Sequence, residues 1–255
     1  MHFSVSIKAV IVASALLITQ TSRGQYFERL VARGDVSDRI FDADEALKDY
    51  LSAIKLEPDN VPLLNRIARQ YRHLMTDAPD RNDKLRLGGI ALRYGMLAAN
   101  LAPNDSEAQL SPAITYGKML PFQGTKEQVA ESPLIKTAAD KAIKLNPRND
   151  DAWHVLGRWH MALANVGMIK RTLGQLIYGK LPPSTNAEAI ACFTKAIEIN
   201  PLRLRHSIEL GRTYAQMGNT SEARKWINKG LSMPNIEKDD PEMKVRGRDT
   251  LATLP

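Results

Sequence analysis

The sequence predicts an all-α fold, a solenoid of helix-turn-helix repeats with insertions and a C-terminal capping helix. Of the 255 residues, 44% are hydrophobic and 6% are aromatic, a balance that favours helices over strands. A phrase recurs four times, each time an alanine-containing helix followed by a proline: Pro58, Pro103, Pro147 and Pro201. Because proline cannot continue a helix, each of the four marks a helix end.

Each proline is followed by a segment with the pattern of a first repeat helix. A tetratricopeptide unit of about 34 residues carries large, apolar, small and aromatic residues in the register W-x2-L-G-x2-Y. The register occurs three times, as Leu64, Ile67, Ala68 and Tyr71, as Trp153, Leu156, Gly157 and His160, and as Ser207, Leu210, Gly211 and Tyr214. Its small residues would let the two helices of a unit approach closely. The sequence therefore predicts about four tetratricopeptide-like units.

The prolines are spaced more widely than a plain array requires. Successive prolines stand 44 to 54 residues apart, against about 34 residues for one unit. We expect the extra residues between the two helices of each unit, near 77–87, 119–131 and 165–184. Pro112 lies in the first helix that fits the register worst, and we expect it to kink or delay that helix. A last helix from about Asp240 should cap the final unit.

Residues 1–24 indicate a secretory signal peptide. Lys8 precedes an apolar run from Ala9 to Ile18, and the small residue Gly24 suits cleavage before Gln25. The run is shorter than the roughly 20 residues of a membrane-spanning helix. We therefore predict an exported chain, periplasmic or secreted, with its repeat domain at 25–255. An uncleaved membrane anchor is the alternative.

Four parts follow one another between Trp153 and the C-terminus. They are the helix with Gly157-Arg158-Trp159, the basic segment MIKRTLGQLIYGK, the turn LPPST and the unit LGRTYAQMGNTSEARKWINKGLSMP. In this order the sequence resembles the regulator of microtubule dynamics protein family, and more loosely so back to about Gln25. The resemblance implies a helical-repeat domain, association with microtubules and, for one family member, a lipid-binding repeat domain. An exported chain would not meet tubulin, so tubulin binding rests on the resemblance alone.

The sequence lacks the motifs and spacings that are typical of catalytic or metal-binding sites. The single cysteine, Cys192, stands in a helical run where a small buried thiol is expected. His154 and His160 are six residues apart, which does not match the i, i+4 spacing of a helical metal site. No G-x-S-x-G motif or phosphate-binding glycine loop occurs. We predict no enzymatic activity, no cofactor, no metal and, with charge this dispersed, no nucleic-acid partner.

Arginine follows the small residue of the repeat register in three units. These residues are Arg69, Arg158 and Arg212, and Asn65 and His154 precede the first two by one helical turn. The first helices of such an array line its concave face, so the three arginines would form a basic groove. Guanidinium groups bind carboxylate or phosphate oxygens through paired hydrogen bonds. We predict a groove for an acidic peptide or carboxylate ligand; alternatively, these arginines pair with nearby acids or stay solvated.

The segment 168–178 is a second candidate surface. Its apolar residues recur at near-helical spacing beside basic ones: Met168, Ile169, Leu173, Leu176 and Ile177. Such a helix can rest on an anionic membrane, cover a lipid or pack on its own domain. Two functions follow. The first is a non-catalytic scaffold with a protein or peptide partner, and the alternative is a lipid-binding or lipid-transfer module that uses the groove and this segment.

Overall fold

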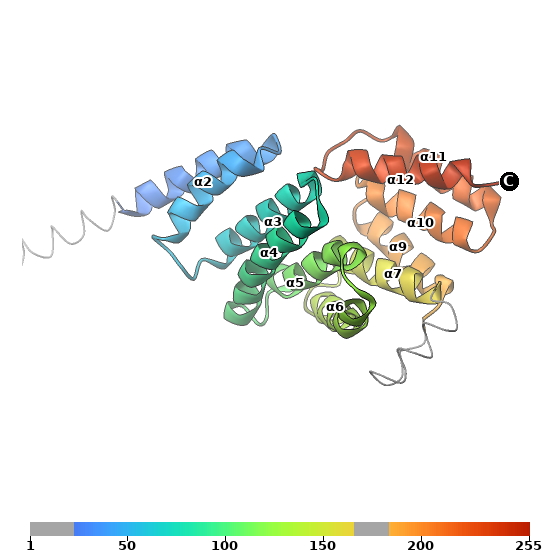
Figure 1. Ribbon diagram of the computed structural model, residues 1–255, viewed down its shortest axis with the longest axis horizontal. Helices are drawn as coiled ribbons and strands as arrows, with labels where there is room; N and C mark the ends of the chain where they lie inside the picture. Colours follow the sequence, from blue (N-terminus) through green and yellow to red (C-terminus); the bar gives the residue numbers. More distant parts are fainter. Residues whose placement is uncertain (1–22, 166–183) are drawn as a thin grey trace, which may run out of the picture.

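The structure is a computed structural model that describes residues 23–165 and 184–255, and these residues form helices without strands. The helices are a first one over residues 23–39, then α2 (Ala43–Ile54), α3 (Val61–Asp77), α4 (Arg81–Leu101), α5 (Ser106–Met119), η1 (Leu120–Phe122), α6 (Thr125–Leu145), α7 (Asp150–Ala164), α9 (Asn186–Ile199), α10 (Leu204–Gln216), α11 (Thr220–Ser232) and α12 (Asp240–Ala252). Figure 1 shows them stacked in chain order. The predicted α-solenoid is confirmed.

The proline boundaries separate helical hairpins. Each of the four prolines lies just beyond α2, α4, α6 or α9, and a new helix begins a few residues later. In the first three cases an acceptor side chain caps the new helix: Asn60, Asp105 and Asn149 each accept the N–H three residues on. A residue that stops one helix is thus followed closely by one that starts the next, which explains the tight reversals.

The extra residues of the first two units extend helices and do not enlarge connections, so the expected insertions are wrong there. α4 and α6 each contain 21 residues, and α3 contains 17. Asp80 accepts the N–H groups of Asn82 and Asp83 and so starts α4 directly after a short turn. Pro112 does not delay its helix, since α5 begins at Ser106 and contains it. Most of the third insertion lies outside the described residues.

Small residues mark the points where the helices of a hairpin cross. A Cβ on Gly157 would lie 2.9 Å from Cε1 of Phe193, and one on Gly211 would lie 2.6 Å from Cγ1 of Ile227. Ala68 is fully buried. These contacts confirm that the small residues of the register serve helix packing. The same core buries Cys192, which raises the pKa of its thiol to about 12.

The first helices of the hairpins, α3, α5, α7 and α10, contact one another in succession, and we call the surface that they form the groove face. α12 packs on α10 and α11, as the predicted cap should. The connection before it, residues 233–239, runs back to the end of α3 (Figure 1). We call these residues the return segment. Its Asp239 accepts hydrogen bonds from Thr76 Oγ1 at 2.9 Å and from Lys118 Nζ at 2.6 Å.

None of the described helices is both long and apolar enough to cross a membrane.

Candidate binding groove

Arg158 on α7 and Arg212 on α10 share the carboxylate of Glu209. Arg212 Nη1 donates to both oxygens of Glu209, at 2.9 and 2.8 Å, and Arg158 Nη1 lies 3.2 Å from Oε1. The carboxylate is fully buried, whereas the two arginine side chains are 39% and 26% exposed. One carboxylate balances only one of the two positive charges. Among the described residues, this part of the groove face therefore carries one partly exposed positive charge more than its paired carboxylate balances.

Arg69 has a different partner from the other two predicted arginines. Its guanidinium pairs with Asp38 of the first helix, which also accepts a hydrogen bond from Gln70 Nε2 at 2.7 Å. Asn65, one turn before it, has a buried Oδ1 without a hydrogen-bond partner among the described residues. The structure thus joins Arg158 to Arg212 through Glu209, while Arg69 helps to hold the first helix against α3.

His154 is a buried residue of the junction between α7 and α10. Its Nδ1 lies 3.0 Å from Nδ1 of His206, and its ring packs edge-on against Phe193. His206 Nε2 lies 2.9 Å from Asp150 Oδ2. Burial lowers the pKa of both histidines, so both rings are neutral near pH 7. The structure places His154 in this packing contact and leaves Arg158, one turn later, at the surface.

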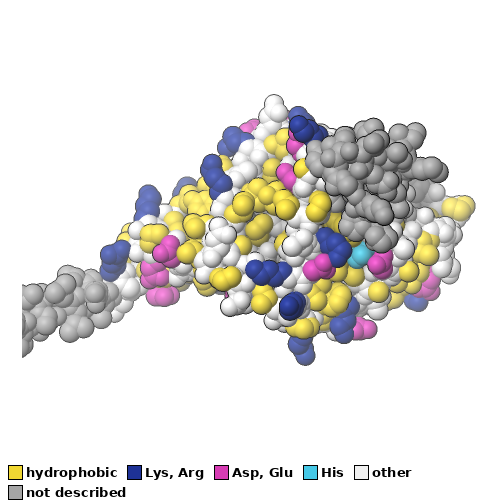
Figure 2. All heavy atoms as spheres, turned by 90° about the horizontal axis from the view of Figure 1, so that it is seen from below, with side chains coloured by type: hydrophobic (Ala, Val, Ile, Leu, Met, Phe, Trp, Pro, Cys, Tyr) yellow, Lys and Arg dark blue, Asp and Glu magenta, His cyan; other side chains and the backbone are white. Residues whose placement is uncertain are grey.

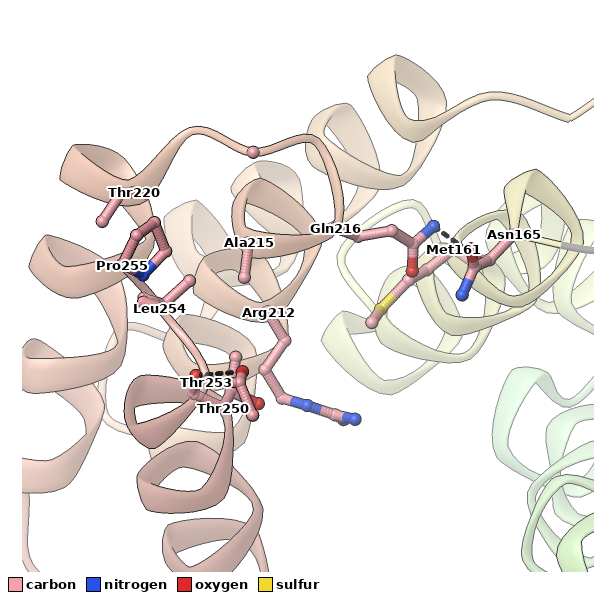
Figure 3. A pocket seen from close by; sticks show the side chains of 11 residues that line it. Met161, Asn165, Arg212, Ala215, Gln216, Thr220, Thr250, Thr253, Leu254 and Pro255 are labelled. Carbon is pink, nitrogen blue, oxygen red and sulfur yellow. Dashed lines mark hydrogen bonds between the residues drawn. The ribbon is translucent and has the colours of Figure 1, made fainter.

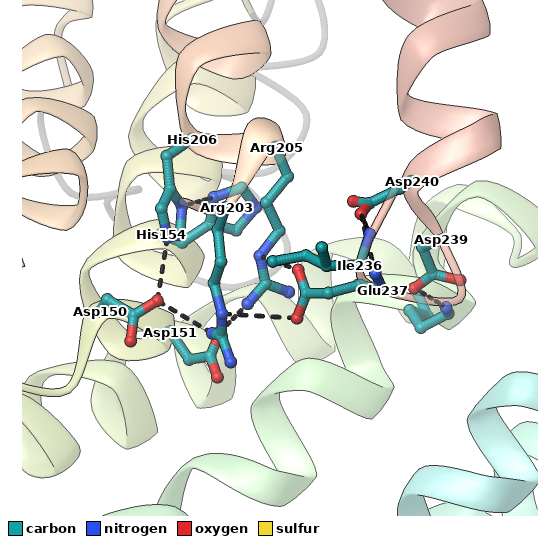
Figure 4. Close-up of polar contacts among 11 residues, drawn as sticks. Asp150, Asp151, His154, Arg203, Arg205, His206, Ile236, Glu237, Asp239 and Asp240 are labelled. Atoms are coloured by element: carbon teal, nitrogen blue, oxygen red, sulfur yellow. Dashed lines mark hydrogen bonds and ion pairs between the residues drawn. The ribbon is translucent and has the colours of Figure 1, made fainter. Parts of the chain in front are cut away.

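A dense charge cluster surrounds the start of α10 (Figure 4). Arg203 Nη1 lies 2.9 Å from Asp150 Oδ2 and 2.6 Å from Asp151 Oδ1, and Arg205 also pairs with Asp151. Glu237 of the return segment is 3.4 Å from Arg203 Nε and 3.3 Å from Arg205 Nε. Burial raises the pKa of Asp151, but Arg205 and Arg203 outweigh it and lower this pKa to about 2. With three carboxylates around two guanidinium groups, the cluster has no positive charge to spare.

Arg72 and Lys118 are basic residues of the groove face that the repeat register does not select. Arg72 Nη1 donates to Ser111 Oγ at 3.3 Å and to Thr115 Oγ1 at 3.2 Å. Lys118, at the end of α5, binds Asp239. Arg72 follows Arg69 by three residues and so shares its helix face. This spacing could have identified Arg72 from the sequence. No sequence pattern indicates that Lys118 pairs with Asp239.

A pocket of about 440 Å³ opens beside Arg212 (Figure 3). Its other walls come from the end of α7, from α10 and from the end of α12, and include Met161, Asn165, Gln216 and Thr250. Gln216 Nε2 is already engaged, since it donates to the Met161 carbonyl at 3.0 Å. The lining is half apolar, from residues such as Met161 and Leu254, and half polar, with the guanidinium of Arg212 among amide and hydroxyl groups. Such a mixture suits a side chain with an apolar stem and a polar or anionic end.

Two predicted features lie outside the described residues. They are the apolar stripe of segment 168–178 and the signal peptide up to residue 22. On the face that Figure 2 shows, acidic and basic side chains are scattered among hydrophobic ones and do not form a patch of one sign. No group of three or more histidine, cysteine, aspartate or glutamate residues in the described ranges is arranged to hold a metal ion.

Stacked hairpins with this proline and glycine register define a helical-repeat protein of the tetratricopeptide class. Among solved structures, a thermophilic tetratricopeptide protein of Thermus thermophilus superposes with a TM-score of 0.62 at 18% identity, covering 89% of this chain and 99% of that one. Pseudomonas aeruginosa pilF gives a TM-score of 0.54 at 13% identity, covering 91% and 90%. At these identities the likeness establishes the fold.

The chain belongs to the family of regulator of microtubule dynamics proteins 1-3, whose family model matches residues 33–255. Regulator of microtubule dynamics protein 1 of Mus musculus is 26% identical over 96% of this chain and 79% of its own length. Protein 3 of Xenopus laevis is 26% identical over 72% of this chain and 40% of its own length. Protein 2 of Homo sapiens is 25% identical over 82% and 51%. The resemblance seen in the sequence is confirmed.

Proposed function

We propose that this protein is a non-catalytic scaffold whose groove face binds an acidic segment of a partner protein. Helical-repeat arrays suit this role because successive hairpins present side chains along one continuous surface. The observation that carries the proposal is the arrangement of Arg158 and Arg212 around Glu209. Their charge exceeds that of the carboxylate between them, and both remain partly exposed.

Glu209 would orient the two guanidinium groups for a ligand. Each uses Nη1 on Glu209 and keeps further N–H donors for a carboxylate, which guanidinium can bind through two parallel hydrogen bonds. Arg212 also lines the 440 Å³ pocket, where a partner side chain could enter. Since ordering a flexible peptide costs entropy, we expect modest affinity that weakens at high salt.

Fluorescence anisotropy with the full chain tests this function. The probes are a labelled glutamate-rich peptide and a glutamine peptide of the same length. We expect the glutamate peptide to bind more tightly, and the double variant Arg158→Met, Arg212→Met to lose about tenfold in affinity or more. Arg246→Met is the control, because in the described part of the chain Arg246 forms its ion pair with exposed Glu242 on α12. Equal binding of both peptides, or an unaffected double variant, would refute the acidic-ligand groove.

A lipid-binding or lipid-transfer module is the second candidate. The sequence of segment 168–178, with its apolar stripe beside basic residues, supports this alternative. Flotation with anionic liposomes tests it, comparing the parent chain with Leu173→Asp and Leu176→Asp. Flotation that these substitutions abolish would favour the lipid module, and no flotation of the parent chain would exclude membrane contact through this segment.

Export is a further proposal and rests on residues 1–24. The mass of the protein isolated from its native compartment decides it, since cleavage before Gln25 would remove these residues. A mass that retains them supports the uncleaved anchor. The relatives are named as regulators of microtubule dynamics, and co-pelleting with microtubules tests whether that property extends to this chain.

A further inference from the structure

Arg72 is a buried cation without an acidic partner. Only 8% of its surface is exposed, and within the described residues it forms no ion pair. Its Nη1 donates to the hydroxyls of Ser111 and Thr115, while Nε and Nη2 have no hydrogen-bond partner in the same ranges. Burial, with Arg69 nearby, lowers the pKa of Arg72 to about 10, which leaves it charged at neutral pH.

The described charged residues around Arg72 pair with one another and not with it. Lys118 and Arg69 are the neighbouring cations, and they pair with Asp239 and Asp38 respectively. His73, on the same helix, adds no charge because burial lowers its pKa to about 4. Beyond them, Lys238 pairs with Asp77 at 2.8 Å, and Asp151 belongs to the arginine cluster of α10. The arginine cluster holds three carboxylates for two guanidinium groups, and the charge of Asp151 raises the pKa of Arg72. None of the described acids, however, forms an ion pair with Arg72.

A purely structural role does not account for this residue well. A buried charge without a counter-charge is costly, and an apolar side chain of similar length can pack two helices together at lower cost. The hydroxyls on α5 satisfy only one of its three nitrogens. An anion beside Arg72 would therefore find unused donors and a charge that has no ion-pair partner among the described residues.

Asp239 brings a carboxylate to Lys118 and Thr76, near enough to Arg72 for its charge to act on that residue. It enters from the return segment and binds Lys118 Nζ at 2.6 Å and Thr76 Oγ1 at 2.9 Å. Its charge acts on Arg72 as well, because it partly offsets the lowering of that pKa. The side chain of Asp239 is 40% exposed, so the contact opens to solvent.

We propose that Arg72 and Lys118 form an anion subsite that takes a side-chain carboxylate of the acidic partner segment, and that Asp239 fills this subsite in the unbound chain. The acidic nature of the partner rests on the proposed function. The position of the subsite, and its occupation by Asp239, rest on the contacts described above. A partner carboxylate replaces Asp239 on Lys118 and Thr76 and engages the free donors of Arg72. The return segment thus competes with the partner.

Competition by Asp239 should lower the affinity of the chain for an acidic peptide. A carboxylate tethered in the same chain acts at high effective concentration and suppresses binding of a free one. The probe is a labelled peptide with the sequence of residues 234–241, PNIEKDDP, and its control has Gln and Asn in place of the three acids. Asp239→Asn should bind the acidic probe about tenfold more tightly than the parent chain does. Glu198→Gln removes the same charge from an exposed pair on α9 and should leave affinity unchanged.

Arg72→Met and Lys118→Met, each in the Asp239→Asn chain, should abolish that gain. Thermal unfolding separates binding from structure. Arg72→Met should keep or raise the unfolding midpoint while it loses the probe, whereas a merely structural Arg72 would lower the midpoint. Affinity of Asp239→Asn no higher than that of Glu198→Gln would overturn the proposal.

The outcomes also separate this subsite from the proposed function. Probe binding that depends on Arg158 and Arg212 but not on Arg72 or Lys118 would reject the subsite and keep the acidic-ligand groove. Failure of every variant to bind the probe would reject both. Binding to vesicles that contain phosphatidylserine is the last measurement. If the chain binds these vesicles through Arg72 but does not bind the peptide, the subsite takes a lipid headgroup and the peptide assignment is overturned.

Discussion

The Nδ1 atoms of His154 and His206 face each other at 3.0 Å between α7 and α10. His206 Nε2 lies 2.9 Å from the Asp150 carboxylate, which only accepts, so this nitrogen carries a proton. In the neutral ring Nδ1 is then an acceptor, and His154 Nδ1 must donate to it. The contact is therefore built for two neutral rings, and a proton on His154 Nε2 would add a charge to a buried site.

Acid should destabilise the protein well above the range in which its carboxylates titrate. Burial lowers the pKa of His73 to about 4 and lowers those of His154 and His206 as well. A lowered folded-state pKa gives stability that is present above about 6.5 and is lost as the pH falls towards the folded-state value. His73 alone should cost about 2 kcal/mol between pH 7 and pH 5. Urea unfolding at both values should show this loss reduced in His73→Leu, and equal losses in the two chains would contradict it.

Gly211 should not tolerate a methyl group. A Cβ there would lie 2.8 Å from the Ile227 backbone nitrogen and 2.9 Å from the Ala223 carbonyl oxygen, and backbone atoms cannot move aside as a side-chain end can. Gly211→Ala should therefore cost about 2 to 3 kcal/mol of unfolding free energy. Gly117→Ala, also within a helix but with nothing within 4 Å, should gain about 0.5 to 1 kcal/mol. Similar effects at both sites would disprove the close crossing.

Removal of the charge on Glu209 should destabilise the junction of α7 and α10. The Glu209→Gln variant would leave Arg158 and Arg212 without their shared carboxylate. We expect a loss of about 1 to 3 kcal/mol in urea unfolding, because the carboxylate is fully buried while its partners are partly hydrated. Glu242→Gln, on an exposed pair, should change stability by less than about 0.5 kcal/mol. The prediction fails if the two substitutions cost the same.

Asn149 should contribute more than an ordinary helix cap. Its Oδ1 accepts the Ala152 N–H at 3.0 Å, and its Nδ2 donates to Ser106 Oγ at 2.8 Å, which links α7 to α5. Asn149→Ala should cost about 2 kcal/mol, one part for the cap and one for the buried contact. Asn219→Ala removes only the cap of α11 and should cost about 1 kcal/mol. Thermal or urea unfolding of the two variants measures the difference.

The fold could be predicted from the sequence because short sequence patterns mark the helix ends and the helix crossings of each repeat. Prolines and capping residues act within a few residues of their position, and the glycines of the register contact the second helix of their own hairpin. The helix lengths were harder to predict. Asp80 caps α4, so the residues expected to form an insertion belong to that helix. A repeat of fixed length gives no sign of such an extended helix.

The candidate site was only partly predictable. Arg158 and Arg212 follow from the register, and Glu209 could have been found three residues before Arg212. The contacts of Asp239 could not, because they join residues 163 and 121 positions apart in the chain. No periodicity in the sequence carries information about such a pair.

The contact of Asp239 with Thr76 and Lys118 also fixes how many repeats this array can hold. In an open array each unit touches only its neighbours, so evolution can insert or delete a unit without disturbing the remainder. Here the last unit also contacts α3 and α5. One unit more or fewer between α3 and the return segment would separate Asp239 from its partners. The array from α3 onward should therefore unfold as one cooperative unit despite its repetitive plan.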